Sequence, residues 1–364
     1  MFFEIARDSL LDSLSKTVPI TEKRTSLPIL SHILLEAMNN TATLVATDLE
    51  VGIKVTNECQ VRESGTLALP SKKMYEIVRE LGSSIIEIST LDPFKLVIQA
   101  GQSVFQLSGM DAGDYPAWAS PEEGSEVSIS AEKLLYMIDK TMFAASSDDS
   151  RFNLNGILFE RDENKTRFVA TDGHRLALIS EELGLPLERN VVVPRKGIAE
   201  LRRVLEGVKE EIVFGIENKN LFVKTERFLM TVRLIEGEYP DYRKVIPAPG
   251  DNFVKINRQN LIKTIRRVAV FTSDRNKGVT VQVVPGKMEI TAQHPDLGTA
   301  RDVVDVQYEG AEFSVIVNAS YLQEAVNAVD TEIMYLEFQK EGSPVILRPE
   351  GTDTYFNLVM PMRK

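Results

Sequence analysis

The sequence predicts an α+β protein made of three copies of one module, in which two helices pack on one side of curved antiparallel sheets. Three observations predict this fold: segments that recur at a fixed offset, one-sided apolar stripes at helical spacing, and short runs in which apolar and polar residues alternate. A chain of 364 residues is also too long for one ordinary core, so we expect several domains.

The repeat is most visible between the first and second modules. The segment Val45-Ala46-Thr47-Asp48 recurs unchanged as Val169-Ala170-Thr171-Asp172, 124 residues later. Three further pairs keep this register: Ile5 to Leu11 with Ile129 to Leu135, Leu69 to Lys72 with Val193 to Lys196, and Gly113 to Pro116 with Gly237 to Pro240. Four matches in one register favour a true internal repeat over chance.

A third copy is weaker but traceable. Ile256 to Ile262 matches the opening segment, Val317 to Ser320 follows Val193 to Lys196, and one glutamate recurs as Glu76, Glu200 and Glu324. We therefore predict three domains at 1–120, 127–247 and 253–364, joined by the loop-like stretches 118–124 and 247–251.

Each module reads as two similar halves, in which a short strand leads into a helix and more strands follow. The apolar stripes fall in six helical segments: 6–17, 70–82, 130–141, 194–209, 258–267 and 319–330. Between them lie runs with strand character, among them Thr43 to Ala46, Lys95 to Ile98 and Glu332 to Phe338. Six helices and roughly two dozen strands are expected on this reading.

Composition bounds the functional classes. The chain begins with an apolar run broken by charge and has no stretch near the roughly 18 uncharged apolar residues of a membrane span, so we expect a cytoplasmic protein without a membrane partner. One cysteine, Cys59, excludes an intramolecular disulfide and a Cys-rich metal site. A net charge of −11 argues, taken alone, against nucleic acid as a partner.

Positive charge is nevertheless concentrated on the helices. Two helical segments carry most of it, through Arg195, Lys196, Arg202, Arg203 and Lys209 in one, and Arg258, Lys263, Arg266 and Arg267 in the other. An acidic protein with a basic helical surface suits attraction to phosphates on one side only. Solvated helix faces are the alternative explanation, and charge alone does not exclude it.

Catalytic motifs are sparse. The sequence has no glycine-rich phosphate loop, no His-Glu-x-x-His, no Cys-x-x-Cys and no nucleophile elbow, and we expect neither a metal nor another cofactor. The segment Thr171-Asp172-Gly173-His174-Arg175 is the one that resembles a reactive site. Its Thr-Asp pair repeats Thr47-Asp48 at a strand end, which favours a structural turn.

At this point a family resemblance becomes specific. The segments Thr171 to Ala177, Gly237 to Arg243 and Val359 to Arg363, with Ser26 to Leu30 and Arg151 to Gly156, resemble the bacterial DNA polymerase III beta subunits, the DNA sliding clamps. The likeness runs from Met1 to Lys364. It implies a non-enzymatic processivity factor that encircles double-stranded DNA without sequence preference, as a head-to-tail homodimer whose six domains close a ring.

The resemblance also implies a hydrophobic cleft between the second and third domains. There the alpha subunit of DNA polymerase III, the clamp loader and repair proteins would insert a short motif with Gln and Leu or Phe anchors. Matched motif by motif, the cleft comprises Leu154, Thr171, Gly173, His174, Arg175, Leu176, Pro240, Val245, Asn318, Tyr321, Leu358, Met360, Pro361, Met362 and Arg363. Lys244 stands where an arginine is common in the family, and Asn276 stands where some members have an aromatic residue; both departures bear on the motif preference and not on the cleft itself.

Two further sets of residues follow from the resemblance and the charge pattern. We expect Arg24, Lys72, Arg195, Lys196, Arg202 and Arg266 to face the DNA and contact phosphates. At the joint between subunits we expect Val270 and Phe271 of the third domain to meet a strand of the first domain near Leu107.

Two functions from other classes remain open on the sequence alone. One is an enzyme that uses Asp172, His174 and Arg175, for example a phosphoryl-group hydrolase. The other is a repeat scaffold that assembles proteins without touching DNA. Loss of hydrolysis on His174→Ala would favour the enzyme, and failure to stay on closed circular DNA would favour the scaffold.

Overall fold

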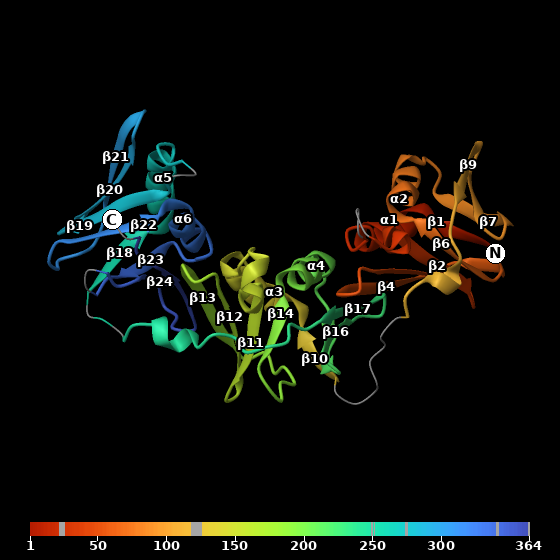
Figure 1. The fold of residues 1–364 in the computed structure, drawn as a ribbon, viewed down its shortest axis with the longest axis horizontal. Coiled ribbons are helices and arrows are strands. Elements are labelled where there is room, and N and C mark those ends of the chain that lie inside the picture. Colours follow the sequence, from red (N-terminus) through yellow and green to blue (C-terminus); the bar gives the residue numbers. More distant parts are fainter. Residues whose placement is uncertain are drawn as a thin grey trace. The chain divides into compact units, whose positions relative to one another are not determined.

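The structure is a computed structural model that describes residues 1–21, 26–117, 126–248, 250, 252–273, 276–339 and 342–362 (Figure 1). The chain forms two compact units, one from Met1–Lys133 and Lys196–Leu234 and the other from Leu134–Arg195 and Ile235–Lys364. The predicted linker 118–124 lies outside the described residues, as do residues 249 and 251 of the second linker. Each unit combines segments from more than one repeated module.

The first unit contains two antiparallel sheets. One sheet has the order β5-β1-β7-β8-β9 and consists of β1 (Phe2–Ala6), β5 (Gln60–Glu63), β7 (Ile85–Asp92), β8 (Lys95–Ala100) and β9 (Ser103–Ser108). The other has the order β10-β15-β16-β17-β4-β3-β2-β6 and consists of β2 (His32–Met38), β3 (Thr41–Thr47), β4 (Val51–Glu58), β6 (Gly65–Pro70), β10 (Glu126–Ser130), β15 (Glu211–Glu217), β16 (Asn220–Lys224) and β17 (Phe228–Arg233). Strands of the first and second modules therefore share one sheet.

The second unit repeats this arrangement. Its larger sheet has the order β14-β11-β12-β13-β25-β24-β23-β18 and consists of β11 (Gly156–Asp162), β12 (Lys165–Thr171), β13 (Arg175–Glu181), β14 (Val191–Pro194), β18 (Phe253–Asn257), β23 (Ile333–Glu337), β24 (Val345–Pro349) and β25 (Tyr355–Val359). Its smaller sheet has the order β21-β20-β19-β22 and consists of β19 (Gly278–Val284), β20 (Lys287–His294), β21 (Gly298–Asp305) and β22 (Phe313–Asn318). Here strands of the second and third modules share a sheet.

The predicted helices are confirmed within the described part of the chain, with ends that differ by a few residues. They are α1 (Arg7–Thr17), α2 (Ser71–Glu80), α3 (Ala131–Thr141), α4 (Arg195–Leu205), α5 (Arg258–Ala269) and α6 (Ala319–Asn327). Short 3-10 turns accompany them: η1 (Pro28–Ser31), η2 (Ala112–Asp114), η3 (Met142–Ala144), η4 (Asp149–Leu154) and η5 (Tyr242–Val245). The segment predicted at 194–209 ends earlier as a helix because Gly207 adopts a positive φ of 79°, a conformation that stops a helix.

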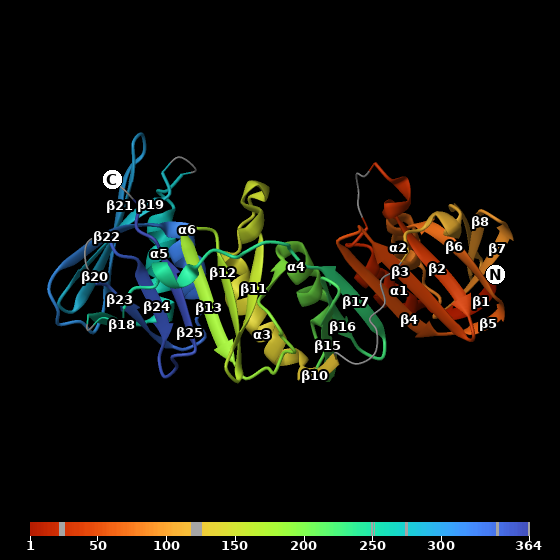
Figure 2. The ribbon, with the colours of Figure 1, turned by 60° about the horizontal axis from the view of Figure 1, so that its bottom comes forward.

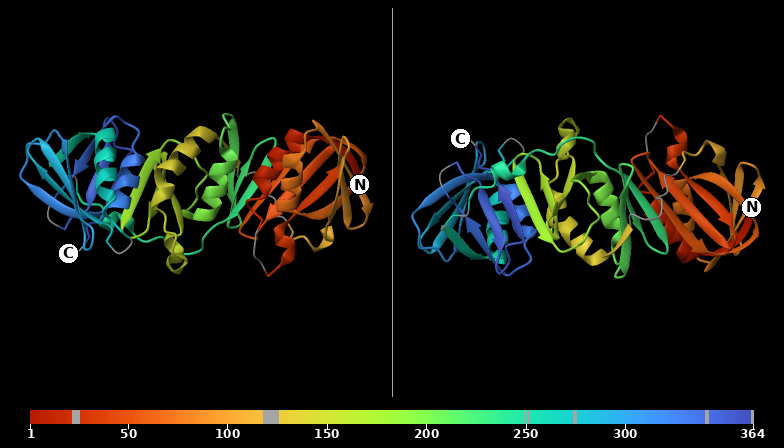
Figure 3. Two further views of the ribbon diagram at one scale, coloured as in Figure 1. Left: turned by 90° about the horizontal axis from the view of Figure 1, so that it is seen from above. Right: turned by 90° about the horizontal axis from the view of Figure 1, so that it is seen from below.

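Local sequence explains where the elements begin and which face they bury. Asn257 and Asn318 cap α5 and α6, since each side-chain oxygen accepts a hydrogen bond from an amide of the first turn. Strand β19 alternates, with Val279, Val281 and Val283 buried, as the period of a strand requires. In the first unit α1 and α2 lie on one side of the strands, and in the second α5 and α6 do the same (Figures 2 and 3).

None of the helices in the described ranges combines the length and the apolar character that a membrane crossing requires.

Close contact between a helix and a sheet gives a first test. Gly197 of α4 lies so near β17 that an added Cβ would come within 2.2 Å of Val232 Cγ1. We expect Gly197→Ala to lower the free energy of unfolding by roughly 1–3 kcal/mol, because the helix must move off the sheet. Gly82→Ala is the matched control, since a Cβ there meets no atom within 4 Å. Urea unfolding of both variants measures the difference; equal midpoints would contradict the close packing.

Candidate functional site

The second unit holds the C-terminal segment against strands of two modules. Strand β25 pairs with β13, with Arg175 opposite Val359 and Leu176 opposite Leu358. Beyond β25, the amide of Met360 donates to the carbonyl of His174 at 2.8 Å, and the amide of Met362 donates to the carbonyl of Ile316 at 2.8 Å. The C-terminal segment is therefore fixed in place between the two sheets of this unit.

The Thr171 to Arg175 segment is a structural turn. Asp172 Oδ1 accepts from the amides of His174 and Arg175 at 2.9 and 3.1 Å. In the first module Asp48 Oδ1 accepts in the same way from Glu50 and Val51, at 2.9 and 2.7 Å. The repeated hydrogen bonds confirm the predicted turn and use the carboxylate for backbone geometry.

Arg175 lies at the side of this turn and is engaged by several groups. Its Nε donates to Asp172 Oδ2 at 3.1 Å, and its guanidinium also pairs with Glu324 of α6. The guanidinium carbon lies 4.4 Å from the ring centre of Tyr321, whose ring stacks at 6.3 Å on that of His174. Asn318 caps the same helix at the turn that carries Tyr321. Aromatic rings and a fixed cation thus line one side of the site.

An apolar cluster forms the floor beside these groups. Its buried members are Leu158, Val169, Leu176, Leu178, Val192, Tyr242, Ile346, Phe356 and Leu358, with Ile235, Tyr239, Ile246 and Met360 packed against it. Val245 adjoins Ile246 in the chain and Met362 follows Met360 by two residues; they leave 44% and 40% of their surface exposed. Large apolar side chains left in water beside a packed apolar floor are the surface that a short hydrophobic segment can cover.

Two tyrosines of the Gly237 to Arg243 segment attach it to the sheet. The Tyr239 hydroxyl accepts a hydrogen bond from the Thr171 amide at 3.0 Å, and burial raises the pKa of this tyrosine. The Tyr242 hydroxyl donates to Glu160 Oε2 at 2.6 Å, and burial together with this carboxylate raises the pKa of Tyr242 to about 12. Both side chains hold the turn η5, which carries Val245, in position.

Sequence reasoning missed the group at the centre of this attachment. Glu160 is buried on β11, and its carboxylate accepts hydrogen bonds from Tyr242, Arg243 at 2.6 Å, Arg167 at 3.2 Å and Asn190 at 3.2 Å. Burial by itself raises the pKa of Glu160, but the bonds from Tyr242 and Arg243 and the charges of Arg243 and Arg167 lower it overall. The sequence feature that could have indicated this role is an acidic residue, Glu160, at a core-facing position of a strand, with Arg167 opposite it on the next strand.

The structure places the predicted cleft residues within this unit. Leu176, Leu358 and Met360 belong to the apolar floor or pack on it, and Leu154 ends the turn η4, where its carbonyl accepts from Ser146 at 3.0 Å. Pro240 and Val245 lie on the Gly237 to Ile246 segment, and Pro361 bridges to Val317. Gly173 has a positive φ of 86°, which a side chain would strain. Arg363 lies outside the described residues.

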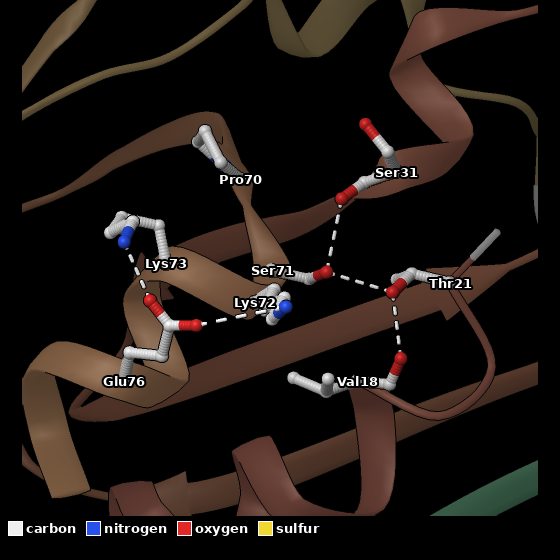
Figure 4. A pocket seen from close by; sticks show the side chains of 8 residues that line it. All are labelled: Val18, Thr21, Ser31, Pro70, Ser71, Lys72, Lys73 and Glu76. Carbon is white, nitrogen blue, oxygen red and sulfur yellow. Dashed lines mark hydrogen bonds and ion pairs between the residues drawn. The ribbon is translucent and has the colours of Figure 1, made fainter. Parts of the chain in front are cut away.

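The residues predicted to face DNA lie at helix ends. Lys72 lines a cavity of about 500 Å³ at the start of α2 (Figure 4). In this cavity the Ser71 and Thr21 hydroxyls form a hydrogen bond at 2.7 Å, and Glu76 forms an ion pair with Lys73 at 2.5 Å. Lys196 pairs with Asp48, Arg195 begins α4, and Arg202 and Arg266 are exposed. Arg24 lies outside the described residues.

Of the residues predicted for the subunit joint, Leu107 is buried in the first unit of the single chain, and Val270 and Phe271 lie in the second unit. Leu107 belongs to β9, an edge strand, and helps to line a cavity of about 430 Å³ together with Phe105 and with Ile77 and Glu80 of α2. Val270 is exposed and Phe271 is partly buried, directly after α5.

Comparison with known proteins shows which family has this sequence and architecture. The N-terminal, central and C-terminal domains of the DNA polymerase III beta subunit match residues 1–119, 128–241 and 243–363. The beta sliding clamps of Pseudomonas putida and Escherichia coli are 34% and 32% identical over the whole of both chains. Solved clamp structures from Pseudomonas aeruginosa, at 33% identity, and from Bartonella birtlesii bound to griselimycin, at 28%, cover the whole of both chains with TM-scores of 0.94 and 0.96.

Three repeated domains of mixed helix and antiparallel sheet, joined by shared sheets, define the class of DNA sliding clamps. The chain belongs to the bacterial DNA polymerase III beta subunit family. It acts as a processivity factor that encircles DNA and binds the polymerase and other partners, and it is not an enzyme. The two alternatives, a hydrolase using Asp172, His174 and Arg175 and a scaffold that never touches DNA, are therefore wrong.

The buried carboxylate gives a test of the site's construction. We expect Glu160→Gln to lower the free energy of unfolding by roughly 1–3 kcal/mol at neutral pH and to speed hydrogen exchange in residues 242–246. The lowered pKa means that the contribution of Glu160 is present above its ordinary titration range and is lost as pH falls through the lowered pKa. Unfolding at a series of pH values should show the two proteins converging in acid.

Glu337→Gln is the matched control for that variant. Glu337 pairs with Arg348 at 2.5 Å on the same sheet and has no bond to η5. Equal exchange in residues 242–246 for both variants would show that Glu160 does not hold this segment.

Proposed function

We propose that two copies of this chain join head to tail into a closed ring of six domains, with boundaries at 1–120, 127–247 and 253–364 in each copy. The ring holds duplex DNA by topology and works in the cytoplasm, where a bacterial chromosome is replicated. The cleft of the second unit tethers the alpha subunit of DNA polymerase III, the clamp loader and repair proteins. The observation that carries the ring is strand pairing between modules.

Each joint inside the chain follows one rule. The last strand of the second module, β17, pairs with β4 of the first, and the last strand of the third, β25, pairs with β13 of the second. The corresponding last strand of the first module is β9, and the strand of the third module that corresponds to β4 and β13 is β21. Both are sheet edges in the single chain, and a second copy supplies each with its missing neighbour.

The repeat also sets the register of that pairing. When the β8–β9 hairpin of the first module is aligned with the β16–β17 hairpin of the second, Phe105 corresponds to Met230 and Leu107 corresponds to Val232. Since Met230 lies opposite Ile53 and Val232 opposite Val51, Phe105 would face Ala300 and Leu107 would face Gly298 of the partner subunit.

Burial supports the same joint. Met230 is 0% exposed under its neighbouring strand, whereas its equivalent Phe105 is 37% exposed in the single chain. Ile20, which follows α1, is buried inside the first unit, and the equivalent residue after α5 is the partly exposed Phe271. The cavity beside β9 and α2 has the size to receive such an aromatic ring.

The cleft suits a short segment with apolar anchors. Leu176, Leu358 and Met360 supply the floor, and Val245, Pro361 and Met362 supply the margin that a Leu or Phe anchor would cover. Arg175 is already oriented by Asp172 and Glu324, so it offers a fixed polar contact to the Gln of a partner motif. Solved clamps from Pseudomonas aeruginosa and Bartonella birtlesii bind griselimycin, which supports small-ligand binding in the family.

The DNA contacts are proposed to be few and directed at phosphates. Lys72, Arg202 and Arg266 are exposed on α2, α4 and α5 and add positive charge to an acidic chain, and Arg24, Arg195 and Lys196 complete the set. Contacts of this type carry no sequence information and weaken with salt.

Retention on DNA tests the ring directly. After loading, the protein should stay on closed circular DNA in high salt and leave the same DNA once it is linearised, because topology and not affinity holds it. The measurement is gel filtration of the loaded complexes before and after cutting. Equal loss from both forms, or a sequence-specific footprint that survives high salt, would contradict the proposal.

The proposed cleft gives a second testable prediction, on peptide binding. A peptide with Gln, Leu and Phe anchors should bind with micromolar affinity, on the order of −8 kcal/mol, and Met362→Ala should weaken it by about 1–2 kcal/mol. Met38→Ala is the control, since Met38 is 46% exposed on a strand of the first unit, close to the 40% of Met362. Fluorescence anisotropy with a labelled peptide measures both. Unchanged affinity of Met362→Ala would move the binding site elsewhere.

The proposed joint between subunits gives a third testable prediction. Phe271→Ala should shift the protein toward a folded monomer that still binds the cleft peptide, because a buried aromatic is lost at both joints at roughly 3–5 kcal/mol each. Phe253→Ala, an exposed aromatic of the same unit, should remain dimeric. Sedimentation at micromolar concentration distinguishes them. A monomeric unmodified protein, or a dimeric Phe271→Ala, would show that the joint is misplaced.

A further inference from the structure

An arginine joins two modules inside the first unit by binding a helix end. Arg203 of α4 donates to the carbonyls of Ser15 and Lys16 at 2.6 and 2.7 Å, in the last turn of α1. Glu200 orients the guanidinium, accepting from Nε at 2.9 Å and from Nη2 at 2.6 Å. Carbonyls in a last helical turn have no partner within the helix, so a cation there satisfies them and opposes the negative end of the helix dipole.

The second unit joins its modules with the same chemistry. Lys140 of α3 is buried and donates to the carbonyl of Ala328, directly after α6, at 2.5 Å. Asp330 pairs with the same ammonium group at 2.5 Å. Both joints within the chain therefore place a cation of the second module on a helix end of its neighbour.

The end of α5 repeats the end of α1 bond by bond. The Ile20 amide donates to Thr17 O at 3.1 Å, as the Phe271 amide donates to Val268 O at 3.1 Å. The Thr21 hydroxyl donates to Val18 O at 2.7 Å, as the Thr272 hydroxyl donates to Ala269 O at 2.8 Å. In this register the carbonyls that correspond to Ser15 and Lys16 are those of Arg266 and Arg267.

The residue that corresponds to Arg203 in the first module is Arg79. The offset of 124 residues that aligns α2 with α4 places Arg79 on Arg203 and Glu76 on Glu200. In the single chain the Arg79 side chain is 53% exposed at the end of α2, where it pairs with the neighbouring Glu80 at 3.0 Å and lies 5.7 Å from the ring centre of Tyr75. It lies on the helix whose residues Ile77 and Glu80 line the cavity beside β9.

We propose that Arg79 of each copy binds the main-chain carbonyls of Arg266 and Arg267 of the partner subunit, as Arg203 binds those of Ser15 and Lys16. This assignment rests on the ring proposed above. In that ring α2 faces α5 of the partner subunit, in the relation that α4 has to α1 within the chain. Arg79 then forms a third kind of contact between a cation and a helix end across a module joint, after those of Arg203 and Lys140, and this kind joins the two subunits.

The local charges permit this contact. Arg267 pairs with Asp302 at 2.5 Å, which offsets the positive charge of its side chain near the approaching guanidinium. Glu76 and Glu80 lie one turn or less from Arg79 on α2 and offset the positive charge of the α5 end. A guanidinium suits the task because it can bond two neighbouring carbonyls at once, whereas an ammonium group presents a single point of charge.

Dimer lifetime tests the assignment. Arg79→Ala should raise the rate of dimer dissociation by roughly tenfold or more, since each ring loses two charge-assisted contacts. Arg79→Lys should restore part of the lifetime, and Arg62→Ala should behave as the unmodified protein because Arg62 pairs with Glu4 on another face of the first module. Subunit exchange between differently labelled copies measures the rates. Arg79→Ala with the lifetime of Arg62→Ala overturns the assignment.

A cross-link tests the geometry independently. In a Cys59→Ser background, a chain carrying Arg79→Cys and Arg267→Cys should form a covalent dimer with a short bismaleimide, and either single substitution should not. Lys16→Cys with Arg203→Cys should cross-link within one chain and serves as the positive control. Absence of the covalent dimer, when the positive control reacts, overturns the assignment.

The Phe271→Ala variant separates the two proposals. If it remains a stable dimer, the joint itself is wrong and the Arg79 assignment falls with it. If it dissociates while Arg79→Ala keeps its lifetime, the ring stands and only the Arg79 contact is wrong.

Discussion

Pairing of strands across module boundaries is the constraint on which the rest of this structure depends. Because β17 completes the sheet of β4 and β25 completes the sheet of β13, no module can be removed without exposing a ladder of backbone groups. The same pairing leaves β9 and β21 as edges. By the rule of the joints within the chain, β9 and β21 are the two edges that lack their counterpart neighbour, and in the proposed ring a second copy supplies both.

Cations at helix ends add a second layer to each joint. Arg203 and Lys140 satisfy carbonyls that their own helices leave without donors, so they contribute to both hydrogen bonding and electrostatics. These contacts are directional, unlike the apolar packing beside them. Each joins a side chain of the second module to a helix end of a neighbouring module, Arg203 to the first and Lys140 to the third.

The cleft proposed in the second unit depends on a buried charge as much as on its apolar floor. Glu160 holds Tyr242 and Arg243, and through them the turn η5 that carries Val245. Several hydrogen bonds offset the cost of burying the carboxylate. The apolar margin can therefore stay exposed to water without collapsing on the floor, which a surface that receives short segments requires.

The sequence by itself determined the repeat, the helical stripes, the structural role of Asp172 and the acidic balance, because local patterns and spacing encode these. Only the tertiary structure decided which modules share a sheet, that Glu160 holds Tyr242, and that Arg203 reaches α1. Those features join residues tens to more than a hundred positions apart through strand register and helix ends, and no periodicity in a single sequence records such distances.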